Sequence, residues 1–101
     1  MQKFVWKVVC LENKIAICLD QQLADKTSPV TEYFFWPQSD AWDELNKLLE
    51  SKPWITLSNR IFVLNILTDL INYWDEKKSF DQSDWPLLKE KFPDVVFIYI
   101  K

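Results

Sequence analysis

The chain contains neither glycine nor histidine among its 101 residues. Without glycine it cannot form the glycine-rich loops that cradle phosphate groups, or the fingerprint that binds dinucleotides. Without histidine it lacks the most frequent general base of enzymes and a principal nitrogen ligand of zinc. These two absences argue against nucleotide-dependent catalysis, ordinary acid–base catalysis and a typical zinc site.

Cysteine is also scarce, and the two cysteines do not suggest a disulfide. Cys10 and Cys18 lie in two predicted strands of a hairpin, in a register that points their side chains to opposite faces of the sheet. Two cysteines without histidine also make a poor zinc site. We therefore expect two free thiols, no metal and no other cofactor.

Long apolar runs are missing as well. None approaches the roughly 20 residues that a membrane-spanning helix needs. Lys3 and Lys7 interrupt the apolar residues at the N-terminus, which argues against a signal peptide, and no arginine-rich transit peptide is recognisable. The sequence therefore predicts no membrane partner. We expect that the protein acts in the compartment where it is made, or that the sequence is already the mature form.

Hydrophobic residues are plentiful, at 49% of the chain with 16% aromatic, which is enough for the core of a single domain over residues 1–101. The formal net charge is −3. A generally basic nucleic-acid-binding protein is therefore not expected. Any contacts with phosphate groups must come from a local patch of basic residues.

Three segments are predicted to be strands by their β-branched and aromatic residues, namely 3–11, 15–20 and 95–100. An Asn13-Lys14 turn would join the first two and pair Cys10 with Ile17. The last strand is apolar on both faces, which is typical of a strand in the interior of a sheet.

Three further segments are predicted to be helices. The first begins at Ser39 or Asp40 and ends at Lys52-Pro53, and a short one runs over residues 83–92. Between them, the longest helix begins at Thr56 or Ser58 and runs to about Lys77, and we expect it at the centre of the core. Its apolar stripe consists of Ile61, Leu64, Leu67, Ile71 and Trp74.

The element order is then β-β-α-α-α-β, which belongs to the α+β class. Consecutive elements tend to reverse direction, so three helices would return the last strand antiparallel to the first. We predict a small antiparallel three-stranded sheet in the order 2-1-3, with the helices packed on one face.

One stretch, residues 27–55, holds three of the six tryptophans and three of the five prolines, which suggests a segment that packs into the core. Within it Tyr33, Phe34, Phe35 and Trp36 are consecutive. They cannot all face inward in an extended segment. Two interpretations remain open: the helices bury all four rings, or some rings are exposed and stack on an RNA base or a partner protein.

Carboxylates cluster in two places, but neither cluster predicts catalysis. A catalytic pair needs two carboxyl groups in different environments across a cleft. Asp40, Asp43 and Glu44 suit the electrostatics of a helix start, and Asp75 and Glu76 suit a solvated helix end. We expect no catalytic residue, no small-molecule substrate and no enzyme activity.

Four long and unusual motifs cover nearly the whole chain. They are LENKIAICLDQ at residues 11–21, TSPVTEYFFWPQSDAWDELNKLLESKPWI at 27–55, INYWDE at 71–76 and KFPDVVF at 91–97. Together they resemble the plastid and cyanobacterial ribosomal protein family, also called plastid-specific ribosomal protein three. The resemblance implies a non-catalytic component of the small (30S) ribosomal subunit, in the chloroplast stroma or the cyanobacterial cytoplasm.

The partners that this resemblance implies are ribosomal RNA of the small subunit and neighbouring ribosomal proteins. Lysines near the helix ends either complement helix dipoles or form a patch that contacts phosphate groups. The candidate residues for contacting RNA or the ribosome are Arg60, Lys77, Lys78, Lys89, Lys91, Lys101 and, for stacking, Trp36.

A second hypothesis is a soluble interaction module that meets the ribosome only transiently, as an assembly factor or a regulator of translation. Both hypotheses predict a monomer when the chain is isolated. They differ in whether the protein stays with the small subunit after a salt wash.

Overall fold

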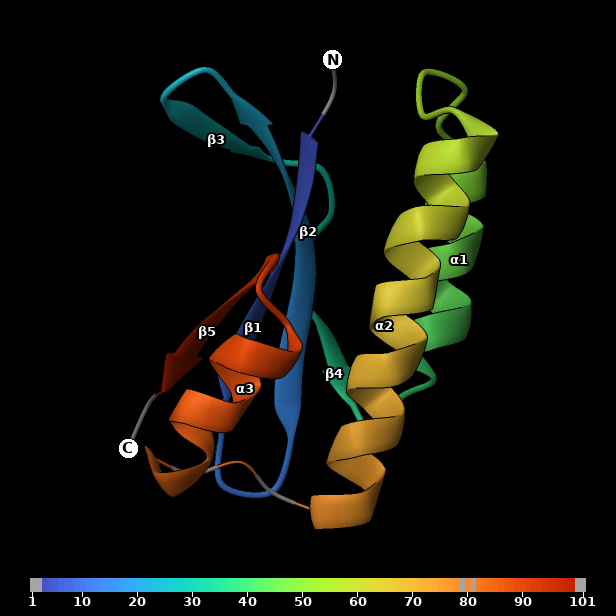
Figure 1. Ribbon diagram of the computed structural model, residues 1–101. Coiled ribbons are helices and arrows are strands. Elements are labelled where there is room, and N and C mark those ends of the chain that lie inside the picture. The colour runs from blue at the N-terminus through green and yellow to red at the C-terminus, as the bar shows by residue number, and fades with distance from the viewer. Residues whose placement is uncertain (1–2, 79, 81, 100–101) are drawn as a thin grey trace.

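A computed structural model describes residues 3–78, 80 and 82–99, and shows a mixed sheet covered by helices on one face (Figure 1). The elements in chain order are β1 (Lys3–Cys10), β2 (Ile15–Leu23), β3 (Lys26–Pro29), β4 (Phe34–Trp36), α1 (Ala41–Glu50), α2 (Leu57–Lys77), the 3-10 turn η1 (Gln82–Asp84), α3 (Trp85–Lys91) and β5 (Val95–Tyr99). The α+β class is as predicted. Among the described helices, none is long and apolar enough to cross a membrane.

The sheet differs from the predicted one in size and in the sense of its last strand. The described residues form five strands. Four lie in the order β3-β2-β1-β5, and β4 pairs with a different part of β2 from the part that pairs with β3. The β1–β2 pair is antiparallel as predicted, but β5 lies parallel to β1. The prediction of a three-stranded, fully antiparallel sheet was therefore wrong, although the neighbour order β2-β1-β5 matches the predicted 2-1-3.

The reason for the parallel pair is one additional reversal of the chain. The segment at Phe34–Trp36 was left outside the predicted sheet, whereas it forms β4 and runs antiparallel to β2. β3 already runs antiparallel to β2 and β4 continues in the same direction, so the chain reverses once more, after β2, before it enters the three helices. The last strand then returns in the direction of β1 rather than against it.

The hairpin between β1 and β2 is also shifted by two residues from its predicted register. Cys10 pairs with Ile15 rather than with Ile17. The Leu11 N–H donates to the Lys14 carbonyl at 3.0 Å, so the tip of the turn is Glu12-Asn13. A shift of two leaves every side chain on its predicted face, because side chains alternate with a period of two.

Opposite Leu19, the strand that pairs with β2 is interrupted. Asp20 pairs with Pro29 of β3, and Ile17 pairs with Phe34 of β4. Two residues of β2 therefore face the four residues 30–33. The backbone N–H groups of Val30 and Thr31 both donate to the Leu19 carbonyl, at 2.8 and 3.2 Å.

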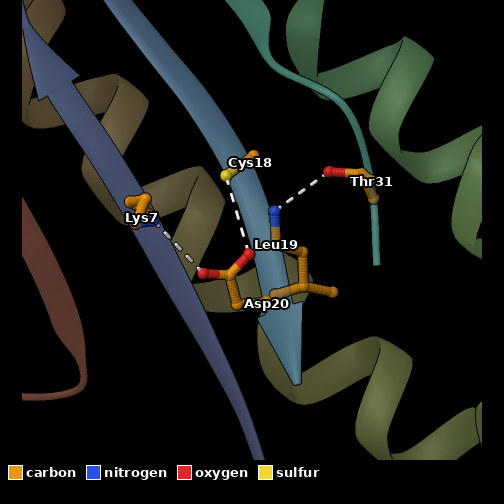
Figure 2. A network of polar contacts seen from close by, with 5 residues as sticks. All are labelled: Lys7, Cys18, Leu19, Asp20 and Thr31. Carbon is orange, nitrogen blue, oxygen red and sulfur yellow. Dashed lines mark hydrogen bonds and ion pairs between the residues drawn. The ribbon is translucent and has the colours of Figure 1, made fainter. Parts of the chain in front are cut away.

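Thr31 satisfies the other backbone group of Leu19 with its side chain. The Leu19 N–H donates to the Thr31 hydroxyl oxygen at 3.0 Å, and the hydroxyl in turn donates to the Glu32 carbonyl at 2.9 Å (Figure 2). Thr31 is buried. A buried N–H group requires a hydrogen-bond partner. The Thr31 hydroxyl gives the Leu19 N–H this partner in place of the bond between strands that the interruption removes.

The helices begin where their capping residues predict. The Asp43 N–H donates to the Asp40 carboxylate at 3.1 Å, and the Asn59 N–H donates to the Thr56 hydroxyl at 3.1 Å. The short helix α3 differs, since Asp84 rather than Ser83 is its N-cap residue.

The central position of α2 in the core is confirmed. It buries Val63, Leu64, Leu67, Leu70, Ile71 and Trp74. Ile61 was placed in this stripe by the sequence but is 50% exposed, because three of the four steps along the stripe are of three residues, which turns Ile61 about 140° away from Trp74 around the helix axis. Across this contact, the Trp6 indole N–H of β1 donates to the Val63 carbonyl at 2.8 Å and joins the two layers.

The last strand lies at an edge of the described sheet, not in its interior. Only β1 pairs with β5 there. Phe97 packs against Phe80 and Trp85 on the helix side, while Val96 and Ile98 are exposed on the other face. The residues of β5 are therefore apolar on both faces although α3 covers only one of these faces.

Replacement of Trp74 by alanine should lower the free energy of unfolding by about 3–5 kcal/mol, because a large ring would leave a cavity in the core. Ile61→Ala is the control on the same helix and should cost less than about 1 kcal/mol, because this side chain is half exposed. Urea unfolding of both variants measures the difference. Equal losses would contradict the assignment of the buried face of α2.

Thr31→Val removes the hydroxyl but keeps the branched shape, and leaves the buried Leu19 N–H without a partner. We expect a loss of about 1–3 kcal/mol in thermal or urea unfolding, and faster hydrogen exchange at the Leu19 amide. Thr27→Val, on the exposed strand β3, is the matched control and should change stability by less than about 0.5 kcal/mol. A Thr31 variant as stable as the control would show that its hydroxyl is dispensable.

Candidate nucleic-acid interface

Lysines gather where α2 ends and α3 runs beside it. The Lys91 Nζ lies 5.2 Å from the centre of the Tyr73 ring, and the Lys77 Nζ lies 5.9 Å from the same centre. Lys78 is the C-cap residue of α2 and Lys89 lies in the last turn of α3, and both are exposed. The structure thus brings Lys77 and Lys91 to one ring, with Lys78 next to Lys77 and Lys89 in the same turn of α3 as Lys91. We call these four candidate residues the lysine cluster: Lys77, Lys78, Lys89 and Lys91.

This cluster is not uniformly basic. Lys77 forms an ion pair with Asp84 at 2.8 Å, in which the Asp84 side chain is only 13% exposed. Glu90 lies between Lys89 and Lys91 in the sequence, and is exposed like them. Lys78 and Lys89 are thus the members best placed to meet a phosphate group.

Of the other three candidates, Arg60 and Trp36 do not join the cluster. Arg60 lies in the first turn of α2, about 25 Å along the helix axis from Lys77. Lys101 is outside the described residues. The Trp36 ring is partly buried, and its indole N–H donates to the Asp75 carboxylate at 2.9 Å, so it links β4 to α2.

Two of the four consecutive aromatic rings are exposed. Tyr33 is 42% exposed and Phe35 is 39% exposed, while Phe34 and Trp36 pack against the core. Complete burial, one of the two interpretations left open by the sequence, is therefore excluded. Phe35 pairs with Ala16 on the uncovered face of the sheet, and the Lys14 Nζ lies 5.3 Å from the centre of its ring.

A second apolar surface surrounds the start of α2. Leu57 and Ile61 lie four residues apart on one helix face and are 61% and 50% exposed, and Trp54 just before them is 45% exposed. Sequence analysis missed this surface, because it placed Ile61 in the buried stripe, although steps of three residues turn Ile61 away from the face that holds Leu67 and Trp74.

A groove of about 510 Å³ lies between α2 and the connection from α3 to β5. Its walls carry three carboxylates, Asp69, Glu76 and Asp94, and its apolar lining includes Tyr73 and Phe92. The sequence analysis missed it too, since Asp94 is 18 residues from Glu76. The spacing of Asp69 and Glu76, seven residues apart on one helix, was the available signal.

The polar groups of β2 form a network on the uncovered face of the sheet (Figure 2). Asp20 is buried, pairs with Lys7 at 3.7 Å, and accepts a hydrogen bond from the Cys18 thiol at 3.9 Å. Burial raises the pKa of Cys18, and a hydrogen bond with Tyr33 partly opposes that shift. The network stabilises a neutral thiol and offers no nucleophile.

Cys10 is buried on the opposite face of the sheet, under the helices. Burial, and to a lesser degree the negative charge of Asp84, raises the pKa of its thiol to about 12. Both cysteines are free, as predicted. Within the described ranges, no group of three cysteine, aspartate or glutamate residues is arranged to hold a metal ion.

These features define a small α+β protein whose surface carries separate lysine, carboxylate and apolar areas. The model of the family described as plastid and cyanobacterial ribosomal protein (PSRP-3 / Ycf65) matches residues 30–77. A small ribosomal subunit protein cS23 from Euglena viridis is 51% identical over 98 residues, which are 97% of each chain.

Relatives outside Euglena agree with this match. A small ribosomal subunit protein cS23 from the alga Gracilaria tenuistipitata var. liui is 47% identical over 98 residues, or 97% of each chain. A relative from Synechococcus sp. (strain JA-3-3Ab) is 54% identical over 74 residues, which are 73% of this chain and 75% of the relative. The chain therefore belongs to the plastid and cyanobacterial ribosomal protein family.

Alkylation should confirm the state of the cysteines. At pH 8 and without reductant, we expect iodoacetamide to leave Cys10 of the folded protein unlabelled, because its raised pKa and burial keep the thiol protonated and covered. After denaturation, still without reductant, both cysteines should be labelled in mass spectra. Failure to label them there would indicate a disulfide, and would overturn the placement of Cys10 and Cys18 on opposite faces.

Proposed function

We propose that the chain is a non-catalytic, structural constituent of the small ribosomal subunit in plastids or cyanobacteria. The observation that supports this most directly is its identity, near one half over almost its whole length, with relatives that are small-subunit proteins. Its partners are ribosomal RNA and neighbouring ribosomal proteins, and its place of action is the plastid stroma or the cyanobacterial cytoplasm. The isolated chain is a monomer.

The lysine cluster is the proposed contact with ribosomal RNA. A molecule with a net charge of −3 cannot approach RNA through its overall field, so phosphate contacts need local cations. Lys78 at the end of α2 and Lys89 in the last turn of α3 are both exposed, so such contacts are sterically open to them. Of the remaining candidates, Arg60 would act as a separate contact at the other end of α2, and Lys101 and Trp36 are weaker candidates.

The apolar surface at the start of α2 is the proposed contact with a neighbouring protein. Trp54, Leu57 and Ile61 are exposed to about half of their area or more. Contiguous apolar surface of this kind is costly in water and is typical of protein–protein contacts.

Sedimentation distinguishes a constituent from a transient factor. A constituent should remain with the small subunit in a sucrose gradient after a wash at moderate salt, in near-equal amount to the other small-subunit proteins. A transient assembly or regulatory factor would leave in the wash, and that result would replace the proposed function with the second hypothesis.

Replacing all four lysines of the cluster with glutamate should abolish co-sedimentation with small subunits that lack the protein. The physical reason is that each change substitutes repulsion from phosphate for attraction. Exposed charges contribute little to stability, so circular dichroism and thermal unfolding should stay near those of the unchanged protein.

Two further variants make this experiment decisive. Lys78, Lys89 and Lys91 changed to glutamate, with Lys77 retained, keeps the ion pair with Asp84 intact. A control with Lys3, Lys14, Lys26 and Lys52 changed to glutamate has the same net charge as the quadruple variant. Retained co-sedimentation of the folded cluster variants, or equal loss in the control, would remove the lysine cluster from the interface.

A further inference from the structure

We infer that the groove between α2 and the α3–β5 connection binds an arginine- or lysine-rich segment of a neighbouring small-subunit protein. The identity of that neighbour rests on the proposed function, whereas the preference for a basic segment rests on the groove alone. This surface lies beside the lysine cluster but has the opposite charge, so it would meet a different partner.

The groove is built by one stripe of α2. Asp69 and Glu76 are seven residues apart, two turns along the helix, so both carboxylates project from the same face. Asp94 faces them from the turn between α3 and β5. The volume of about 510 Å³ is large enough for extended side chains of a peptide.

The charge of the groove favours a cation. Three carboxylates line it, against the single lysine Lys91, which gives the lining a net charge of −2. Within the described part of the chain, neither Asp69, Glu76 nor Asp94 has a lysine or arginine within ion-pair distance. Carboxylates without an ion-pair partner suit the guanidinium group of arginine, which bonds a carboxylate in a forked geometry.

The aromatic wall of the groove already accommodates ammonium groups. Lys91, which lines the groove, lies 5.2 Å from the centre of the Tyr73 ring, and Lys77 lies 5.9 Å from it. The electron-rich face of this ring thus attracts cations in the folded protein. A partner's basic side chain that displaced Lys91 would find the same ring and, in addition, the carboxylates of Asp69 and Glu76.

Charge also decides between the possible occupants. RNA would bring phosphate groups against three carboxylates, which is repulsive. A second copy of this chain offers Lys77-Lys78 as its only two consecutive basic residues, and Lys77 is already paired with Asp84 at 2.8 Å. A basic segment of another protein satisfies the groove without either conflict.

A peptide titration tests the groove by itself. The probe is a capped eight-residue peptide of alternating arginine and serine, measured against the purified full chain. We expect the combined variant Asp69→Asn, Glu76→Gln and Asp94→Asn to bind it at least tenfold more weakly. The control, Glu12→Gln, Glu44→Gln and Glu50→Gln, loses the same charge elsewhere and should bind within threefold of the unchanged chain. Equal weakening in both variants would overturn the inference.

Crosslinking tests the groove in the assembled subunit. A photoreactive benzoylphenylalanine in place of Asn72, which lines the groove and is exposed, should crosslink to one arginine- or lysine-rich segment of a small-subunit protein. Mass spectrometry of the crosslinked peptides identifies the segment. Crosslinks to ribosomal RNA or to a second copy, or none from a chain that co-sediments, would contradict the inference.

The two experiments separate this inference from the proposed function. If the unchanged chain fails to sediment with small subunits, the proposed function fails, while the peptide titration still decides whether the groove prefers a basic segment. If the chain does sediment and the groove variant binds the peptide as tightly as the control, the inference fails and the proposed function stands.

Discussion

The pairing of β2 with an interrupted partner strand constrains the rest of the structure. The four residues 30–33 face only two residues of β2, and the Thr31 side chain bonds the Leu19 N–H that the break would otherwise leave without a partner. Because the excess is two residues, the inward and outward alternation is preserved across the break. Phe34 and Trp36 therefore face the core, and the chain leaves β4 on the side where α1 and α2 pack.

Local signals in the sequence predicted most elements but not their long-range arrangement. Asp40 and Thr56 cap the helices as expected, and Trp74 is buried as the helical spacing indicates. The parallel sense of β5 could not be predicted without β4, because a three-residue strand has too little periodicity to be distinguished from a loop. The exposure of Ile61 could have been predicted, because a stripe spaced mostly by three residues drifts around a helix of 3.6 residues per turn.

For the candidate site too, the sequence predicted local features but not long-range contacts. Sequence proximity located the lysine cluster, since its members lie at the ends of consecutive helices. It did not show that Asp84 pairs with Lys77, or that Trp36 is held by Asp75. Sequence proximity could not predict the groove, because its walls come from α2 and from the turn after α3. In the proposed function, these surfaces serve as separate places for RNA and for basic proteins on an acidic molecule, as a constituent of a crowded ribonucleoprotein requires.

The most direct test of this account is a reconstruction of the native small ribosomal subunit at side-chain resolution. The account predicts one copy of the chain in its α+β fold, with phosphate groups beside Lys78 and Lys89, and basic side chains of another protein between Asp69, Glu76 and Asp94. A subunit in which the end formed by α2 and α3 faces solvent, with the contacts made elsewhere on the molecule, would contradict it.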